Sequence, residues 1–165
     1  IDYEKAANVV VDAYLQLPKE AGFALLMLGE GNLKETLETQ THGHPVHFPG
    51  FVKTRGELAK IFASSDLYVS AMAHETFGIS IIEAQATGLP VIGVHAGAMP
   101  DRVPPDLGRL GPVGDAKAMA DHILELWQSE TRLTMRKAAR QHVETQFSWA
   151  RTFEHLFKNI YNIAT

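Results

Sequence analysis

The stretch DLYVSAMAHETFGISIIEAQATGLPVIGV, residues 66–94, places two short apolar runs on either side of a helical pattern. Residues 67–70 and 90–94 have the length and composition of short buried strands. The helical residues between them end at Gly88, and glycine is the residue most often found just beyond the last turn of a helix. A strand, a helix and a second strand in this order predict a right-handed βαβ unit with parallel strands.

The same alternation extends over the rest of the chain. Further short strands are expected at residues 23–28 and 46–48 and within 108–115. Helices are expected almost from Ile1 onward and, further along, at 32–39, 55–65, 115–129, 131–145 and 149–163. We therefore predict one domain, residues 1–165, of the α/β class, with a Rossmann-like parallel sheet flanked by helices on both faces.

The expected helices also carry capping and packing signals. Asp115 is a suitable N-cap for the helix that follows it. The aromatic residues that lie on helical stripes, and that we expect in the core, are Trp127, Trp149 and Phe153.

The composition is that of an ordinary globular protein, with 45% hydrophobic and 21% charged residues. The 15 basic and 19 acidic residues give a net charge of −4 without a basic run, which argues against nucleic acid as a partner. No cysteine is present, so thiol catalysis, thiolate metal sites and disulfides are excluded, as fits a reducing cytosol. No apolar run reaches the roughly 20 residues needed to span a bilayer.

Glu75 and Glu83 frame Gly78, where the loop after the 67–70 strand turns into a helix. Glycine lets a ligand approach the backbone, and the free N–H groups of a helix N-terminus attract anions such as phosphate. Ionised carboxylates accept pairs of hydroxyl donors, such as those of a sugar or a ribose. These features indicate a nucleotide-sugar site. The alternative is that Glu83 is a solvated helix residue and Glu75 a partner of the helix dipole.

Residues 74–93, with the GAMPD segment that follows, resemble the donor-binding motif of retaining glycosyltransferases of family 4. That motif reads Glu, a small residue, Phe-Gly, four further residues, Glu-Ala, a short Ala/Gly stretch and Pro-Val. The matching residues here are Glu75, Phe77, Gly78, Glu83, Ala84, Ala86, Gly88, Pro90 and Val91. Other segments similar to the family are LLMLGEG, VHFPGFV, ELAKIFASSDLYVS, GAMPDRV and FSW. The resemblance implies the carboxyl-terminal, nucleotide-sugar-binding half of a GT-B enzyme.

The resemblance also implies roles for individual residues. Glu75 would bind hydroxyls of the transferred sugar, and Glu83 the ribose hydroxyls. The backbone N–H groups that meet the sugar and the diphosphate would be those of Phe77, Gly78 and Ile79. The family holds the diphosphate with an arginine and a lysine separated by four residues; Lys5 would be the lysine, and the arginine would lie just before Ile1. In that register the first strand of the domain is missing from the chain.

Further residues are expected around the donor. Gly29 and Gly31 would shape a turn beside the phosphates. His74 would either contact the donor or cap its loop. The base would be bordered by Phe51, Val52 and Leu58. For the first and last of these three, packing is an equal alternative.

The chain departs from the family pattern at a few positions. Ala71, Met72 and Thr76 replace residues that are usual there, which alters the rim of the site. Asp101 replaces the usual glutamate and is given no contact. Arg102 is expected to form a surface salt bridge rather than to hold an anion.

Three histidines, His42, His44 and His47, are close in sequence. No carboxylate stands beside them at ligand spacing, so a surface loop is predicted rather than a metal site. We expect no metal and no other cofactor.

The activity implied by the resemblance is transfer of a hexose, in carbohydrate biosynthesis, from a UDP-, GDP- or ADP-linked sugar to an acceptor with retention of configuration. Glu75 and Lys5 would be the catalytic residues, with Lys5, the missing arginine and helix N–H groups stabilising the departing diphosphate. The acceptor site would belong to an N-terminal domain, so the fragment alone is expected to be inactive.

Two alternatives stay open. One is a nucleotide-sugar epimerase of the same fold, for which we find no acid/base groups. The other is a non-catalytic Rossmann-like binding module. We expect a cytoplasmic location, at the inner face of the membrane if the full-length enzyme associates with it peripherally.

Overall fold

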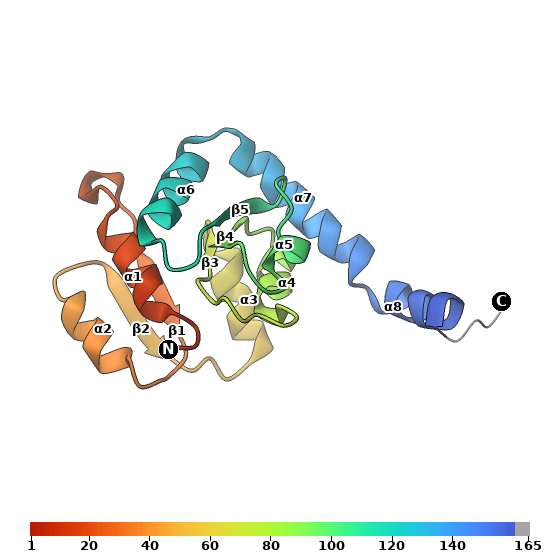
Figure 1. Ribbon diagram of the computed structural model, residues 1–165, viewed down its shortest axis with the longest axis horizontal. Helices are drawn as coiled ribbons and strands as arrows, with labels where there is room; N and C mark the ends of the chain where they lie inside the picture. Colours follow the sequence, from red (N-terminus) through yellow and green to blue (C-terminus); the bar gives the residue numbers. More distant parts are fainter. Residues whose placement is uncertain (161–165) are drawn as a thin grey trace.

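The computed structural model describes residues 1–160 and has an α/β architecture in which helices and strands alternate (Figure 1). The strands are β1 (Leu25–Leu28), β2 (Val46–Gly50), β3 (Tyr68–Val69), β4 (Val91–Val94) and β5 (Gly108–Gly111). The α-helices are α1 (Ala7–Leu15), α2 (Lys34–Gln40), α3 (Arg55–Ala63), α4 (Ile79–Ala86), α5 (Met99–Arg102), α6 (Ala116–Gln128), α7 (Thr131–Gln146) and α8 (Trp149–His155). A 3₁₀ turn (Lys19–Ala21) precedes β1, and a π-helical turn (Leu156–Ile160) follows α8. Every strand expected from the sequence is therefore present.

The described strands all run parallel, but they form two sheets rather than one. β1 pairs with β2, with Leu25 opposite Val46. β3, β4 and β5 pair in that order, with Tyr68 opposite Val91. The prediction of parallel strands is thus correct, but the strands pair in two separate sheets instead of the single sheet that we expected. Because the strands are parallel, the loops that follow the strands of a sheet gather at one edge. The strand expected before Ile1 stays a prediction.

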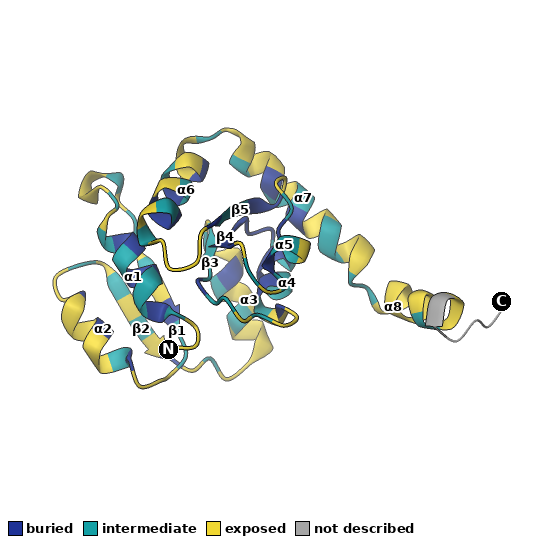
Figure 2. Ribbon diagram, in the orientation of Figure 1, coloured by how far each residue is buried: buried dark blue, intermediate teal, exposed yellow. Residues whose placement is uncertain are grey.

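One hydrophobic core joins the two sheets. Val11 of α1 and Leu126 of α6 pack in it with Met27 of β1 and Ile92 of β4. Leu28 follows Met27 in β1, points to the opposite face and packs on a second cluster built by α3 and α4. Helices therefore cover both faces of the strands. β4 lies between β3 and β5 and is buried along its whole length, which explains its continuous apolar sequence (Figure 2).

Short-range sequence signals begin two of the helices. The Thr54 Oγ1 accepts a hydrogen bond of 3.1 Å from the N–H of Glu57 and donates one of 3.0 Å to the Glu57 carboxylate, which starts α3. Asp115 caps α6 as predicted, since its carboxylate accepts from the N–H of Ala118 at 2.9 Å. Such caps each stabilise a helix by about 1 kcal/mol. They fix where the chain leaves the loops that follow β2 and β5.

Two expectations about the chain ends are wrong. The first helix begins at Ala7, after a turn that contains Lys5, rather than almost from Ile1. Trp149 and Phe153 are 78% and 48% exposed instead of lying in the core, because α8 extends away from the body of the domain (Figure 1). Residues 161–163 of the last expected helix lie outside the described residues.

Trp127 also lies at the surface rather than in the core. Its ring packs edge-on against Phe23, and the guanidinium of Arg132 lies 4.2 Å from its centroid. Among residues 1–160, no helix combines the length and the apolar character needed to cross a membrane.

Candidate functional site

Two of the loops predicted to form the site meet at the carboxyl edge of β3 and β4. The N–H of Ala98, in the loop after β4, donates a hydrogen bond of 2.8 Å to the carbonyl oxygen of Glu75, in the loop after β3. Between these loops there is no room for a side chain at Gly97, since a Cβ there would lie 2.5 Å from the same carbonyl oxygen. We call residues 73–78 the donor loop. Its path is therefore fixed by main-chain contacts with its neighbour.

The Glu75 side chain folds back onto its own loop. Its Oε1 accepts hydrogen bonds from the N–H of Gly78 at 2.8 Å and from the N–H of Phe77 at 3.3 Å. The sequence led us to expect these N–H groups to be available to a ligand, whereas here a carboxylate occupies them. This contact corresponds to the alternative named above, in which Glu75 is a partner of the helix dipole, and the ligand-binding role of these N–H groups stays a prediction.

Gly78 permits this arrangement by its backbone conformation. Its φ of +80° lies in the left-handed region that side chains disfavour, and a Cβ would come within 2.9 Å of the Ile81 side chain. Ile79 begins α4 with its side chain 64% exposed, and α4 has no side-chain cap of its own. The Ile79 side chain is therefore exposed next to the donor loop, whereas Gly78 itself is buried.

Glu83 lies further along α4 and is half-buried. Tyr68 of β3 contacts the same helix, since its hydroxyl donates to Ser80 Oγ at 2.9 Å. Burial raises the pKa of Tyr68, the Ser80 hydrogen bond partly offsets this, and the negative charges of Glu75 and Glu83 raise it further. Both carboxylates therefore lie within electrostatic reach of one phenol.

The start of the chain lies beside the loop after β1. The amino group of Ile1 donates to the carbonyl oxygen of Glu30 at 2.6 Å. A Cβ added to Gly31 would overlap the carbonyl of Ile1, so glycine is needed here for close packing, and its place beside the phosphates stays a prediction. Gly29 closes the strand end by donating to the carbonyl oxygen of Gly50 at 2.8 Å. The Lys5 side chain is exposed in the turn before α1 and not in a first helical turn.

A hollow of about 490 Å³ follows β2 and contains two of the residues predicted to border the base, Phe51 and Val52. The Phe51 side chain is 73% exposed, so it does not pack in the core. Leu58 does pack, against the cluster around Phe62, and for this residue the packing alternative is correct. His74 is exposed on the donor loop.

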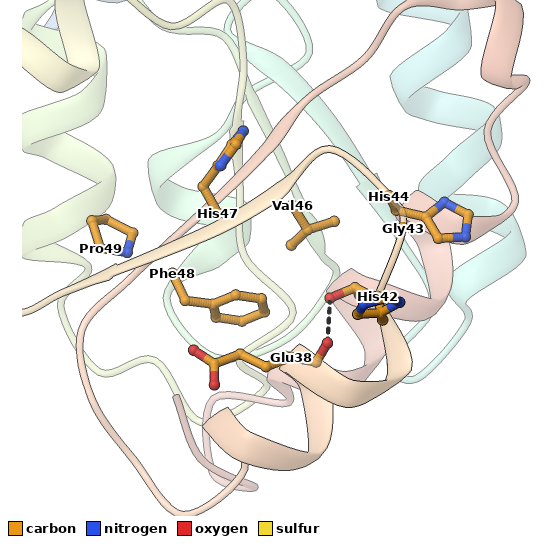
Figure 3. A pocket seen from close by; sticks show the side chains of 9 residues that line it. Glu38, His42, Gly43, His44, Val46, His47, Phe48 and Pro49 are labelled. Carbon is orange, nitrogen blue, oxygen red and sulfur yellow. Dashed lines mark hydrogen bonds between the residues drawn. The ribbon is translucent and has the colours of Figure 1, made fainter.

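The three neighbouring histidines line a different hollow, of about 540 Å³, between α2 and β2 (Figure 3). His47 projects from the side of β2 opposite to Phe48, so it does not converge with His42 and His44 (Figure 3). Within residues 1–160 no group of three or more metal-binding side chains comes together. The elements that border this hollow, α2 and β2, lie away from α4 in the domain (Figure 1).

The expectation of a surface salt bridge for Arg102 is wrong, because in the described part of the chain no carboxylate lies within 4.0 Å of its guanidinium. Arg102 Nε instead donates to the carbonyl oxygen of Phe77 at 2.8 Å. The sequence reading missed this contact, and it also missed Tyr68 and Ser80. The residues in each of these contacts are far apart in the sequence, so no local sequence pattern indicates them.

Comparison with known proteins identifies the family and the fold of the chain. Residues 1–129 match the sequence profile of the family described as "Glycosyl transferases group 1". The chain is 34% identical over 154 residues to the sulfoquinovosyl transferase of Arabidopsis thaliana, which covers 90% of this chain and 29% of that protein. It is 31% identical over 153 residues to the GDP-mannose-dependent alpha-(1-6)-phosphatidylinositol dimannoside mannosyltransferase of Mycobacterium tuberculosis, covering 92% and 39%.

Among solved structures, HepE of Anabaena in complex with UDP superimposes with a TM-score of 0.83 at 21% identity, covering 98% of this chain and 46% of that one. This likeness establishes the fold. The chain spans less than half the length of each of these proteins. It belongs to the glycosyl transferases group 1 family and corresponds to the carboxyl-terminal half of the GT-B fold.

Proposed function

We propose that the chain is the donor-binding domain of a glycosyltransferase that moves a hexose from a nucleoside diphosphate sugar to an acceptor with retention of configuration. The observation that carries the proposal is the Glu75 carboxylate on the N–H groups of Phe77 and Gly78. This contact shows that the backbone N–H groups at the amino end of α4 already bind an anion, the Glu75 carboxylate. Retention rests on the resemblance of residues 74–93 to the retaining family.

A diphosphate would take the place of this carboxylate. Phosphate oxygens accept hydrogen bonds from backbone N–H groups at a helix N-terminus and gain from the helix dipole. Once displaced, Glu75 is free to accept hydroxyls of the sugar, which are donors that a carboxylate binds well. Glu83, within the same α4, would accept the ribose hydroxyls. The two acids thus bind opposite ends of one extended ligand.

The base would lie in the hollow formed by Phe51 and Val52 after β2. An exposed aromatic ring beside a hollow suits stacking of a planar base. The relatives give independent support for a nucleotide sugar: one is named as GDP-mannose-dependent, and HepE was solved with UDP. The experiment below would first show whether this chain binds UDP, GDP or ADP.

The chemistry proposed is electrostatic. Negative charge grows on the departing diphosphate in the transition state, and preorganised N–H groups together with Lys5 would stabilise it. Such groups do this without a metal ion, so we propose none. The acceptor and its binding site would come from an N-terminal domain, and the full-length enzyme would act in the cytoplasm.

Calorimetry on the full-length protein with UDP-, GDP- and ADP-linked sugars tests the proposal. We expect binding of one of them, and loss of about tenfold or more in affinity for Glu83→Ala, because a hydrogen-bonded charged group is removed. Glu144→Ala, on the exposed face of α7, is the matched control. No heat with any donor would favour a non-catalytic module, and unchanged binding by Glu83→Ala would remove the ribose role. An assay for transfer against epimerisation separates the two enzyme classes.

A further inference from the structure

Arg102 ends α5 and reaches across to the donor loop. Its Nε donates a hydrogen bond of 2.8 Å to the carbonyl oxygen of Phe77, which is 25 residues away in the sequence. Its guanidinium also lies over two aromatic rings, 4.8 Å from the centroid of Phe77 and 5.3 Å from that of Phe147. Phe147 lies at the C-terminal end of α7, so one side chain contacts two segments that are distant in the sequence, the donor loop and the end of α7.

The main chain of Arg102 is itself held firmly. Gln85, near the C-terminal end of α4, is fully buried and donates from Nε2 to the Arg102 carbonyl oxygen at 2.7 Å. The other end of α5 is tied to the donor loop, since the N–H of Ala98 donates to the carbonyl oxygen of Glu75 at 2.8 Å. α5 is thus attached to the donor loop and to α4, and the Arg102 side chain starts from a fixed point.

The hydrogen bond to Phe77 has a direct geometric consequence for the anion site. The carbonyl oxygen of Phe77 and the N–H of Gly78 belong to one planar peptide group and point in opposite directions. A donor that fixes the oxygen therefore fixes the direction of the N–H. That N–H is the one that donates to the Glu75 carboxylate at 2.8 Å.

We infer that Arg102 is a positioning residue, which holds the Phe77–Gly78 peptide so that the Gly78 N–H points at the bound anion. Arginine suits this task because its planar, permanently charged guanidinium donates a directed hydrogen bond and stacks on aromatic rings at once. Phe147 supports the guanidinium from α7. The inference rests on the proposed function only for the identity of the anion as the donor diphosphate.

Hydrogen exchange measured on the ligand-free, full-length protein tests the inference without any ligand. In Arg102→Ala we expect the amides of residues 77–79 to exchange about tenfold faster than in the parent, because the local opening of the loop becomes easier. Arg102→Lys should not restore protection, since an ammonium neither stacks as a plane nor donates in the same direction. Arg140→Ala, an exposed arginine paired with Glu144, is the control and should exchange as the parent does.

Phe147 provides the sharper variant, because it is distant in sequence from the donor loop. Phe147→Ala should also raise exchange at residues 77–79, whereas Phe147→Tyr, which keeps the ring, should not. Parental exchange at 77–79 in Arg102→Ala would overturn the inference. Equal acceleration in the core helix α6 would also overturn it, since that result indicates general destabilisation rather than positioning.

Nucleotide binding then distinguishes this inference from the proposed function. With UDP, GDP and ADP as probes, the nucleotide that binds the parent should bind Arg102→Ala about tenfold more weakly. If none of the three binds the parent, the proposed function fails while the exchange result still decides the inference. If one binds the parent and Arg102→Ala equally well, the positioning role is wrong.

Discussion

The carboxylate of Glu75 accepts a 2.8 Å hydrogen bond from the N–H of Gly78, at the amino end of α4. A group proposed to bind the sugar thus occupies the backbone site proposed for the diphosphate. In the proposed function, binding of the diphosphate therefore exchanges one anion for another. Removal of the Glu75 carboxylate should therefore affect the binding of the diphosphate and the binding of the sugar differently, which distinguishes its role from that of a residue whose loss only weakens binding.

Glu75→Ala should separate the two parts of donor recognition. The variant removes a competing negative charge from the N–H groups of Phe77 and Gly78, so we expect a nucleoside diphosphate without sugar to bind with equal or up to about tenfold higher affinity. The gain from adding the sugar, measured as the ratio of the two affinities, should disappear. Calorimetry with the free nucleotide and the sugar nucleotide gives both quantities.

The control for this prediction is Glu144→Ala, which removes an exposed carboxylate on α7. It should change neither affinity. Weaker binding of the sugar-free nucleotide by Glu75→Ala would contradict the competition between the carboxylate and the diphosphate.

Gly97→Ala should lower the free energy of unfolding by more than the cost of placing an alanine at a positive φ. Gly97 has a φ of +56°, and a Cβ would lie 2.5 Å from the carbonyl oxygen of Glu75. Gly114 has a φ of +77° with nothing within 4 Å of the added Cβ, so Gly114→Ala measures the cost of the conformation alone, about 1 to 2 kcal/mol. Thermal or urea unfolding should show a larger loss for Gly97→Ala, together with weaker donor binding. Equal losses for the two variants would mean that the donor loop moves aside freely.

The parts of the fold that were predicted from the sequence are those encoded over short distances. The cap at Asp115 depends on a residue three positions away, and the alternation of strands and helices is read within a few residues. The residues around Gly78 were recognised for the same reason, because the motif lies within one strand-to-helix junction. Strand direction followed from the alternation, but the division into two sheets depends on pairing between distant segments.

The parts that were missed depend on contacts between distant residues. Nothing near Arg102 in the sequence indicates that its partners are Phe77 and Phe147. The stripe that includes Trp149 and Phe153 correctly indicates one apolar helical face, but a stripe does not say whether anything covers it. The hydrogen bonds of Glu75 within its own loop correspond to the alternative of a helix-dipole partner, and sequence spacing did not decide between that alternative and a sugar contact because it does not fix the side-chain conformation.

Leu126→Ala should test whether one core joins the two sheets. Leu126 of α6 is fully buried in the cluster that contains Met27 of β1 and Ile92 of β4. Truncation of a buried leucine costs about 2 to 5 kcal/mol in the free energy of unfolding. Leu133→Ala, at a side chain that is 67% exposed, should cost less than about 0.5 kcal/mol. Urea denaturation followed by two probes should remain a single transition for both variants; separate transitions would mean that the sheets unfold independently.

The pH dependence of stability at alkaline pH should report on the environment of Tyr68. Burial and the carboxylates of Glu75 and Glu83 raise its pKa in the folded protein above the ordinary value of 10.0. The unfolded chain therefore loses this proton before the folded one does, so the favourable contribution is complete below pH 10 and is lost as the pH rises above it toward the folded pKa.

Tyr68→Phe removes the titrating group and should flatten the fall in unfolding free energy between pH 9 and pH 11, although it lowers stability at neutral pH by losing the hydrogen bond to Ser80. Glu83→Gln should flatten the same fall by a smaller amount, because one of the charges that raise the Tyr68 pKa is gone. Urea denaturation at several pH values gives these slopes. If Glu83→Gln leaves the alkaline slope as it is in the parent, the Glu83 carboxylate is not within reach of the phenol, and the inference that both acids act on Tyr68 must be abandoned.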